Sequence, residues 1–129
     1  MVLDMSDRIL CKFCKKNTEL IFEKKYVKAF FDKFPVSKGH TIIVSVRHVE
    51  TIFGLKSYEL EEVVELIGEI KIFLDKLYSP DGYNIGTNCG ELAGQTIDHC
   101  HIHIIPRFKG DVSDPTGGIR GVIPDKRKY

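Results

Sequence analysis

Short apolar segments alternate with charged, glycine- and proline-containing segments along most of the chain. Residues 20–22 and 26–31 are rich in aromatic and β-branched side chains. They flank the charged segment 23–25, a pattern typical of a tight β-hairpin. Residues 40–46 follow a loop with Pro35 and Gly39 and predict a buried third strand, and residues 83–87 predict a fourth.

Between residues 57 and 77 the apolar positions recur every three or four residues, which predicts one long amphipathic helix. Ser57 is the expected N-cap, because its hydroxyl can accept a hydrogen bond from a backbone N–H of the first turn. The stripe expected to pack on a sheet consists of Leu60, Val63, Val64, Ile67, Ile70, Leu74 and Leu77. The glutamate-rich opposite face is expected to be solvated.

The most regular pattern lies further on, where His99, His101 and His103 occupy every second position. Alternate residues of a strand share a face, so the three imidazoles are expected on one side of a fifth strand, with neighbours roughly 6.6 Å apart. A single histidine in an apolar strand is usually structural. Three in strict alternation, after a loop rich in glycine, favour a functional site instead.

These elements predict an α+β fold with an antiparallel sheet of about five strands and one long helix on one face. A chain of 129 residues with 43% hydrophobic residues is expected to form a single domain over residues 1–129. Residues 1–10 are expected to be a flexible N-terminus, and residues 107–129 an irregular C-terminal tail. That tail includes Ile119, Val122 and Ile123, so we expect it to lie on a surface of its own subunit or at a dimer interface.

The charge balance excludes some partners. The formal net charge is only +1, from 19 basic and 18 acidic residues, so no nucleic acid or anionic membrane is expected as a partner. No run of apolar residues is long enough for a membrane span, and the start of the chain does not look like a signal peptide. We therefore expect a cytoplasmic protein whose four cysteines are reduced.

The histidine pattern suggests chemistry on a phosphate ester, because imidazole is a nucleophile, acid and base near neutral pH. His101 is the natural nucleophile because a histidine flanks it on each side. Phosphoryl transfer also needs donors for the phosphate oxygens. The loop before the histidines supplies Asn88, Gln95 and Thr96, together with the backbone N–H groups near Gly94.

A second candidate site begins with Cys11 and Cys14. A Cys-x-x-Cys pair supplies two of the four ligands of a tetrahedral zinc site, and in the cytosol it is a metal candidate before a disulfide candidate. The other two ligands should be histidines, and the candidates are His40, His48 and His99. The alternative is a pair of reduced thiols without a metal.

At this point the chain resembles a known family, the histidine-triad (HIT) superfamily of nucleotide hydrolases and transferases. Its signature, His-φ-His-φ-His-φ-φ with φ apolar, is satisfied by residues 99–105, with Cys100 as the least typical φ. Residues 30–32 with Pro35 and Gly39 are similar to the family's ribose-binding loop, and residues 88–96 to its phosphate loop. The resemblance implies a HIT-like fold and a homodimer.

Carried over to this chain, the resemblance implies that His101 attacks the α-phosphorus of a nucleotide and forms a nucleotidyl-histidine, while His103 bonds a phosphate or bridging oxygen. The implied nucleotide-binding residues are Asp32 for the ribose, Asn88 and Thr96 for the phosphate, Gln95 for the order of the loop, and Phe13 and Phe30 for the base. For the two aromatic residues, ordinary core packing is the alternative.

The resemblance also implies a ligand set for the metal. The first histidine of the motif binds zinc in related proteins that carry an N-terminal cysteine pair. The expected ligands are therefore Cys11, Cys14, His48 and His99. With four protein ligands that zinc would be structural. His40 is then expected to take a hydrogen-bonded role between the third strand and the floor of the site.

The function expected from these residues is hydrolysis or nucleotidyl transfer at the α-phosphate of a purine nucleotide. An adenosine phosphoramidate or a dinucleoside polyphosphate would be the substrate. The alternative is a nucleotide-binding or scaffolding protein with little turnover. An intact His101 beside Asn88 and Thr96 argues against that alternative, because binding alone needs no nucleophile.

Overall fold

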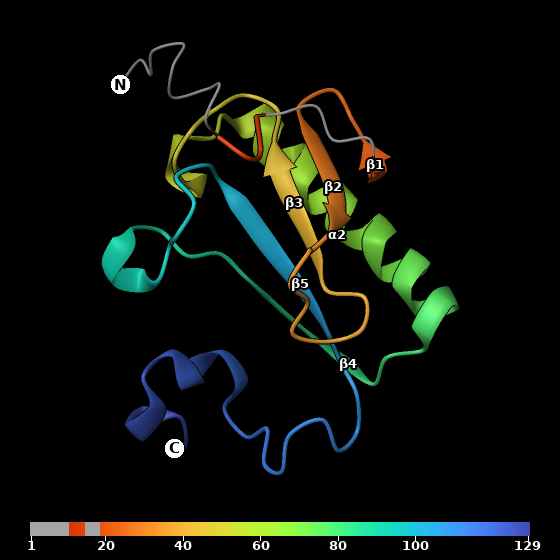
Figure 1. Ribbon diagram of the computed structural model, residues 1–129, viewed down its shortest axis with the longest axis vertical. Helices are drawn as coiled ribbons and strands as arrows, with labels where there is room; N and C mark the ends of the chain where they lie inside the picture. Colours follow the sequence, from red (N-terminus) through yellow and green to blue (C-terminus); the bar gives the residue numbers. More distant parts are fainter. Residues whose placement is uncertain (1–10, 15–18) are drawn as a thin grey trace.

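The computed structural model describes residues 11–14 and 19–129 (Figure 1). Within these residues, five strands form one antiparallel sheet in the order β1-β2-β3-β5-β4. The elements are β1 (Leu20–Glu23), β2 (Val27–Phe31), β3 (Thr41–Ser45), α2 (Ser57–Tyr78), β4 (Gly82–Gly86) and β5 (His101–Arg107), with 3-10 turns η1 (Ile52–Gly54), η2 (Glu91–Ala93), η3 (Gly118–Val122) and η4 (Pro124–Lys126). The predicted α+β fold is confirmed, whereas the predicted flexible segment 1–10 lies outside the described residues.

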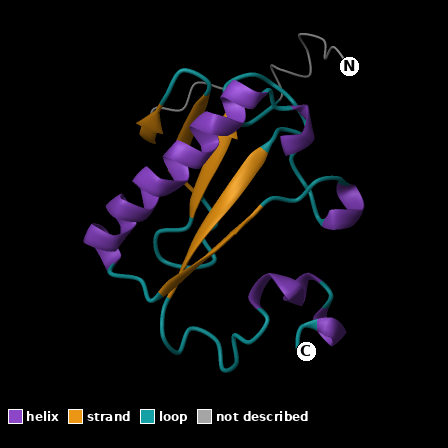
Figure 2. Cartoon of the chain, turned by 180° about the vertical axis from the view of Figure 1, so that it is seen from behind, coloured by secondary structure: helices purple, strands orange, loops and turns teal. Residues whose placement is uncertain are grey.

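Helix α2 covers one face of the sheet (Figure 2). Its buried apolar side chains are Val63, Leu66, Ile70 and Leu74, which pack against β2, β3 and β5. The predicted stripe is wrong in part: Leu60 is 36%, Val64 69% and Leu77 50% exposed, while Leu66 is fully buried. Spacings of three, four and four residues from Val63 follow one line along the helix, and Val64 lies about 100° away from that line.

The helix starts differently from the prediction. It begins at Ser57, so the N-cap is Lys56 and not Ser57. The Glu59 carboxylate closes this end by accepting the Lys56 N–H at 2.9 Å, and it also accepts from the Arg47 guanidinium at 2.6 Å. Burial alone would raise the pKa of Glu59, but these hydrogen bonds outweigh burial and lower it. Glu59 thereby ties the helix to the loop after β3.

The opposite face of the sheet carries a smaller apolar cluster, made of Phe13, Phe30, Ile42 and Val44. Alternation along β2 and β3 explains it, because Val27, Ala29 and Ile43 face the helix while their neighbours face away. The cysteine-containing turn at residues 11–14 packs on this second face. The candidate chemistry therefore lies on the side of the sheet that α2 leaves open.

Beyond β5 the chain forms the tail, residues 108–129, at the far end of the sheet from the turn at residues 11–14 (Figure 1). Arg107 fixes its start through hydrogen bonds to Asp111 at 2.8 Å and to Asn84 at 2.7 Å. The tail is otherwise irregular apart from η3 and η4, and η3 lies beside β4. None of the helices in the described ranges is long and apolar enough to cross a membrane.

Candidate active site and metal centre

Strand β5 places His101 and His103 on the face of the sheet opposite α2. Their partners in β3 are Val44 and Ile42, while the intervening Ile102 packs in the core under the helix. The two imidazole rings lie edge to face with their centroids 5.2 Å apart. The structure thus brings these two histidines together, as the alternation predicts.

The prediction that His99 belongs to the same strand is wrong, although its ring lies on the same face of the sheet, with its centroid 5.9 Å from that of Phe13. Strand β5 begins at His101, because the N–H of Cys100 donates to the carbonyl of Val49 at 2.7 Å instead of continuing the sheet. The His99 ring is fully buried and lies with its centroid 4.7 Å from that of His48. The first histidine of the motif is therefore turned toward the metal candidates and not toward the other two.

Hydrogen bonding fixes which nitrogen of His101 is free. Its Nδ1 lies 2.7 Å from the backbone oxygen of His99. A carbonyl oxygen only accepts, so Nδ1 must carry the hydrogen, and the neutral ring then has its lone pair on Nε2. That nitrogen makes no hydrogen bond to the described part of the chain. His101 is consequently set up with an unengaged nucleophilic nitrogen.

The hydroxyl of Thr87, which the sequence did not single out, hydrogen-bonds to the backbone of His101. Thr87 follows β4 directly, and its Oγ1 donates to the carbonyl of His101 at 2.8 Å. The antiparallel register of β4 and β5, which pairs Gly86 with His103, brings Thr87 to this point. In the sequence, the only indication of this hydrogen bond is that a threonine directly follows the strand that pairs with the histidine strand.

The loop between β4 and β5 is braced by Gln95. Its buried side-chain amide donates to the backbone oxygens of Glu50 at 2.7 Å and Ile97 at 3.0 Å, and its Oε1 accepts the N–H of Gly90 at 2.8 Å. These contacts fit the expected role of Gln95 in ordering the loop. Asn88 is half-buried and Thr96 is exposed. Their phosphate contacts stay predictions.

The residues expected around the ribose and base lie beside the histidines. Asp32 follows β2; its Oδ1 accepts the N–H of Phe34 at 2.8 Å, and its Oδ2 lies 3.5 Å from His40 Nε2. The Phe13 ring is centred 5.7 Å from Phe30 and 5.0 Å from His101. Both phenylalanines are more than 90% buried, so core packing describes them as they lie, and their contact with a base stays a prediction.

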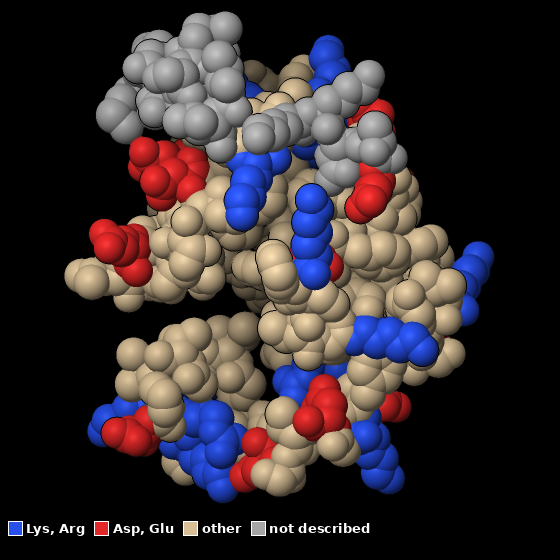
Figure 3. Space-filling view, viewed as in Figure 1, with Lys and Arg blue, Asp and Glu red and all other residues tan. Residues whose placement is uncertain are grey.

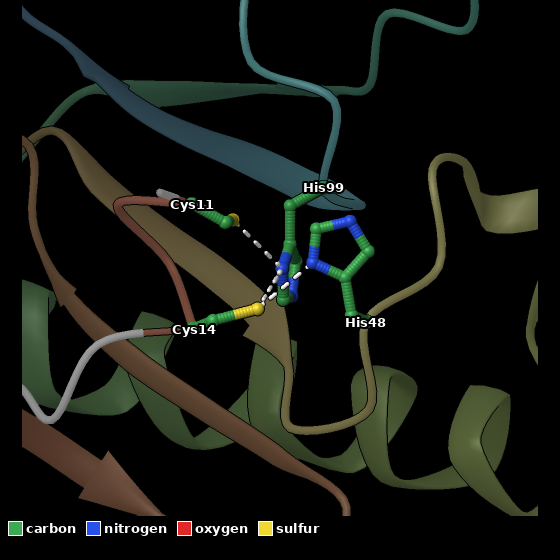
Figure 4. Close-up of side chains that lie close together, drawn as sticks. All are labelled: Cys11, Cys14, His48 and His99. Carbon is green, nitrogen blue, oxygen red and sulfur yellow. Dashed lines mark hydrogen bonds between the residues drawn. The ribbon is translucent and has the colours of Figure 1, made fainter. Parts of the chain in front are cut away.

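Cys11, Cys14, His48 and His99 form the second constellation, with their four ligand atoms within 4.8 Å of one another (Figure 4). The Nδ1 of His99 lies 3.4 Å from the sulfur of Cys11 and 3.5 Å from that of Cys14. The Nδ1 of His48 lies 2.8 Å from the sulfur of Cys14. The residues come from the turn at 11–14, the loop after β3 and the segment before β5.

Backbone contacts prepare His99 to bind a metal. Its Nε2 lies 2.7 Å from the carbonyl of Ser45, which must accept, so the lone pair of the neutral ring is on the Nδ1 that faces the two sulfurs. Burial lowers the pKa of His99 to about 4, against a smaller opposite effect of the Ser45 hydrogen bond. The ring is therefore neutral at physiological pH, the form that binds metals.

The spacing of these atoms can be compared with a zinc site. Zn–S bonds of about 2.3 Å and Zn–N bonds of about 2.0–2.1 Å in a tetrahedron give S···N edges of about 3.6 Å. Two of the three distances above are within about 0.2 Å of this edge, and the one between Cys14 and His48 is shorter. Two thiols and two imidazoles with this spacing fit zinc. His40, the remaining candidate ligand, lies instead beside Asp32 and His103.

Comparison with known proteins adds to this geometry. The family model described as the HIT domain matches residues 14–110. An uncharacterised HIT-like protein of Methanocaldococcus jannaschii is 40% identical over 107 residues, which cover 79% of this chain and 82% of that protein. An adenosine 5'-monophosphoramidase of Schizosaccharomyces pombe is 31% identical, covering 77% and 73%. A bis(5'-nucleosyl)-tetraphosphatase of the same yeast is 32% identical, covering 75% of this chain and 53% of the enzyme.

Solved structures show the same architecture. A HIT family protein from Bacillus anthracis superposes with a TM-score of 0.74 at 33% identity, covering 79% of this chain and 76% of that one. A zinc-bound histidine triad family protein from Mycobacterium smegmatis superposes with a TM-score of 0.73 at 25% identity, covering 83% and 81%. The chain thus shares its fold with a protein that binds zinc.

Proposed function

Because the chain belongs to the HIT family, we propose that it is a nucleotide hydrolase or nucleotidyltransferase that cleaves at the α-phosphate of a purine nucleotide. The observation that carries this proposal is the hydrogen bond of 2.7 Å from His101 Nδ1 to the carbonyl of His99, which leaves Nε2 as a nucleophile. The two yeast relatives act on phosphoramidates and on dinucleoside tetraphosphates by name. These are the two substrate classes we propose.

The proposed reaction has two steps. His101 Nε2 attacks the α-phosphorus and forms a nitrogen–phosphorus bond, while the bond between phosphorus and the leaving group breaks. The leaving group keeps the electron pair of that bond and takes up a proton from solvent. The ring becomes cationic, and the His99 carbonyl that accepts its Nδ1–H stabilises that charge. Water, or another hydroxyl compound in a transferase, then attacks the phosphorus and loses a proton to solvent. The nitrogen–phosphorus bond breaks, its electron pair returns to Nε2, and the nucleotidyl group is released. His101 returns to its neutral form.

Other residues bind the substrate in this proposal. Asp32 accepts hydrogen bonds from the ribose hydroxyls, and Asn88 and Thr96 donate to phosphate oxygens. His103 lies beside the nucleophile and bonds an oxygen of the scissile group. Phe13 and Phe30, which pack against each other on the open face of the sheet, are the residues we propose for contact with the base.

The metal we propose for Cys11, Cys14, His48 and His99 is a structural zinc ion, which would link the turn at 11–14 to the start of β5. Four protein ligands leave no coordination position for substrate. The ligand His99 also provides the carbonyl that holds His101. The metal would therefore support catalysis by fixing a backbone position.

We also propose a homodimer and a cytoplasmic location. Strand β4 lies at the edge of the sheet, and an edge strand with free backbone groups can pair with a second chain. Exposed apolar residues on β4 and on the adjacent η3 are Ile85, Ile119 and Val122. Figure 3 shows a notch between the tail and the body on this side, with acidic and basic side chains interspersed rather than segregated. A second copy with the same apolar residues would fit such a surface.

The alternative is a binding or scaffolding protein without turnover. Both alternatives predict nucleotide binding, so they are distinguished by measuring whether reaction products are formed. We expect the full chain to release amine and AMP from a fluorogenic adenosine phosphoramidate, and a denaturing quench during turnover to show one nucleotidyl group on the intact protein. A panel of phosphoramidates and dinucleoside polyphosphates then ranks the leaving groups. Saturable nucleotide binding without product or adduct from any of them would refute the proposed activity.

A further inference from the structure

The tail returns to the open face of the sheet beside the histidines. Gly86 is the partner of His103 in the pairing of β4 with β5, and directly opposed residues of an antiparallel pair face the same side. Position 86 therefore faces the side on which His103 lies. A Cβ at this position would lie 3.6 Å from Cδ1 of Ile119, an ordinary contact distance. Ile119 thus packs over Gly86, one strand away from His103.

A polar contact holds η3 in this place. Asn84 lies two residues before Gly86 in β4, so it faces the same side of the sheet. Its side-chain oxygen accepts from the Arg107 guanidinium at 2.7 Å. A Cβ at Gly118, the first residue of η3, would lie 3.2 Å from the amide nitrogen of Asn84. The start of the tail and η3 are therefore both packed on the same residue of β4.

The residues proposed for the ribose lie on the other side of His103. Asp32 directly follows β2, and the buried ring of His40 fills the space between it and β5. His40 Nδ1 accepts the N–H of Val36 at 3.1 Å, so its Nε2 carries the hydrogen and donates to Nδ1 of His103 at 2.9 Å. The side toward β2 and β3 is thus occupied by packed protein and, in the proposed function, by the nucleoside.

The strand order then decides where the leaving group lies. Strand β5 carries the attacking His101 between β3 on one side and β4 on the other. With the nucleoside over β2 and β3, the leaving group on the same phosphorus extends over β4. There it meets Ile119 of η3, next to the notch between the tail and the body (Figure 3).

The surface that η3 presents at this point is apolar. Ile119 is 54% exposed, so its side chain remains available for a contact. The neighbouring Arg120 is directed into the tail, where its guanidinium donates to the carbonyl of Lys126 at 2.9 Å and lies over the Tyr129 ring, 4.3 Å from its centroid. The turn η2, in the loop between β4 and β5, begins with the exposed Glu91. An anionic leaving group gains little from such surroundings.

We propose that Ile119 is a specificity-determining residue that favours leaving groups with an apolar substituent. The preferred substrates are then nucleoside phosphoramidates of aromatic or alkyl amines, and not dinucleoside polyphosphates. This inference rests on the proposed function, and it chooses between the two substrate classes named there. When the phosphorus–nitrogen bond breaks, the amine nitrogen keeps the electron pair, takes up a proton from solvent and leaves past Ile119. A polyphosphate would instead place several negative charges against this side chain.

The first test compares three substrates on the full chain loaded with zinc. They are an adenosine phosphoramidate of an arylalkyl amine, the unsubstituted adenosine phosphoramidate and diadenosine tetraphosphate. We expect kcat/KM to be highest for the arylalkyl compound and at least about 10-fold lower for the tetraphosphate. A higher kcat/KM for the tetraphosphate would overturn the proposal and leave the proposed hydrolase activity intact.

The second test is Ile119→Ala. It should lower kcat/KM for the arylalkyl compound about 3- to 10-fold, less than the loss expected in a fully enclosed pocket. The unsubstituted phosphoramidate should change less than about twofold, because its small leaving group does not reach η3. The matched control is Ile123→Ala, which removes the same side chain at a similar exposure of 58% from the residue that follows η3, and it should affect neither substrate. Equal losses for both substrates in Ile119→Ala would contradict a contact with the leaving group.

The third test does not depend on turnover. A non-hydrolysable carbamate that joins adenosine to the same arylalkyl amine should bind the wild type about 3- to 10-fold more tightly than the unsubstituted carbamate does, and Ile119→Ala should abolish this difference. If the wild type shows the difference but turns over none of the three substrates, the proposed function fails and the apolar contact stands. Ile119 also lies near the edge proposed for the dimer. A change of mass to a single chain in Ile119→Ala, with the binding difference retained, would assign this residue to the dimer and overturn the inference.

Discussion

Cys14→Ser is the perturbation that tests the metal centre most directly. The centre brings together groups far apart in the chain, since Cys11 and His99 are 88 residues apart and Cys14 and His48 are 34 apart. The unfolded chain keeps only the Cys-x-x-Cys pair close, so metal binding strongly favours the folded state. Ser replaces a thiolate ligand with a poorly binding hydroxyl and changes little else in volume.

The size of the effect follows from linkage. Zinc stabilises the fold by RT ln(1 + [Zn]/Kd), which is about 1.4 kcal/mol per tenfold increase in free zinc above Kd and about 4 kcal/mol at 1,000 Kd. For a domain of this size, about 4 kcal/mol corresponds to a Tm difference on the order of 10–20 °C. We therefore expect the wild-type Tm to rise with free zinc by about 4–7 °C per decade, and the Cys14→Ser Tm to stay nearly flat.

The assay is thermal unfolding across a series of zinc buffers, together with zinc content by elemental analysis. The matched control is Cys89→Ser, which removes a half-buried thiol outside the metal constellation and should keep the zinc dependence. Because His99 also holds the Nδ1–H of His101, Cys14→Ser should lower kcat about 10-fold or more while KM changes little. Wild-type protein prepared without chelator that contains no zinc would refute the reasoning, as would an identical zinc dependence in Cys14→Ser.

Three further predictions follow from the site and the sheet. His101→Ala should lower turnover by several orders of magnitude and keep nucleotide binding, because strand pairing does not use this side chain; more than a tenth of wild-type turnover would contradict the assignment. Light scattering should give a mass near twice 14.7 kDa, and a mass near one chain at micromolar concentration would contradict the dimer. Burial lowers the pKa of His40 and of His103 below 6.5, so the unfolded chain binds protons that the folded chain does not. Stability from these two groups is therefore complete above about pH 6.5 and falls below it. Denaturant unfolding of Cys14→Ser should show this loss between pH 7.5 and 5, together with the loss from His99, whose pKa burial also lowers. Constant stability would count against the buried neutral histidines.

The sequence was sufficient for the parts of the structure that depend on side-chain periodicity. Alternation along β3 and β5 decides which residues face the helix, and it placed His101 and His103 on the open face. Periodicity also predicted α2, but apolar residues on two adjacent stripes made its buried face ambiguous. Leu66 is not part of the predicted stripe, although it lies at the centre of the core.

Features that depend on the backbone were not predictable in this way. Glu59 is a charged residue that is 1% exposed, and its burial depends on Arg47 and on the N–H of Lys56, which come together only in the fold. The prediction that His99 lies in the fifth strand is wrong because β5 begins two residues later than the histidine pattern does. A hydrogen bond of Cys100 to the loop after β3 causes this offset. No periodicity in the sequence reports such a contact.

The proton positions on the three histidines of the motif show most clearly why the sequence alone is insufficient. The carbonyl of Ser45 leaves the lone pair of His99 on Nδ1, toward the sulfurs, and the carbonyl of His99 leaves that of His101 on Nε2. His103 is controlled from another loop, through His40. Identical side chains at equal spacing thus become a metal ligand, a nucleophile and a donor, because each meets a different backbone group. His99 is both the proposed metal ligand and the residue whose carbonyl accepts from His101, so a disturbance at the metal centre should reach His101 through the backbone at His99. The tautomer of His103 depends instead on the loop between β2 and β3, and it should survive loss of the metal.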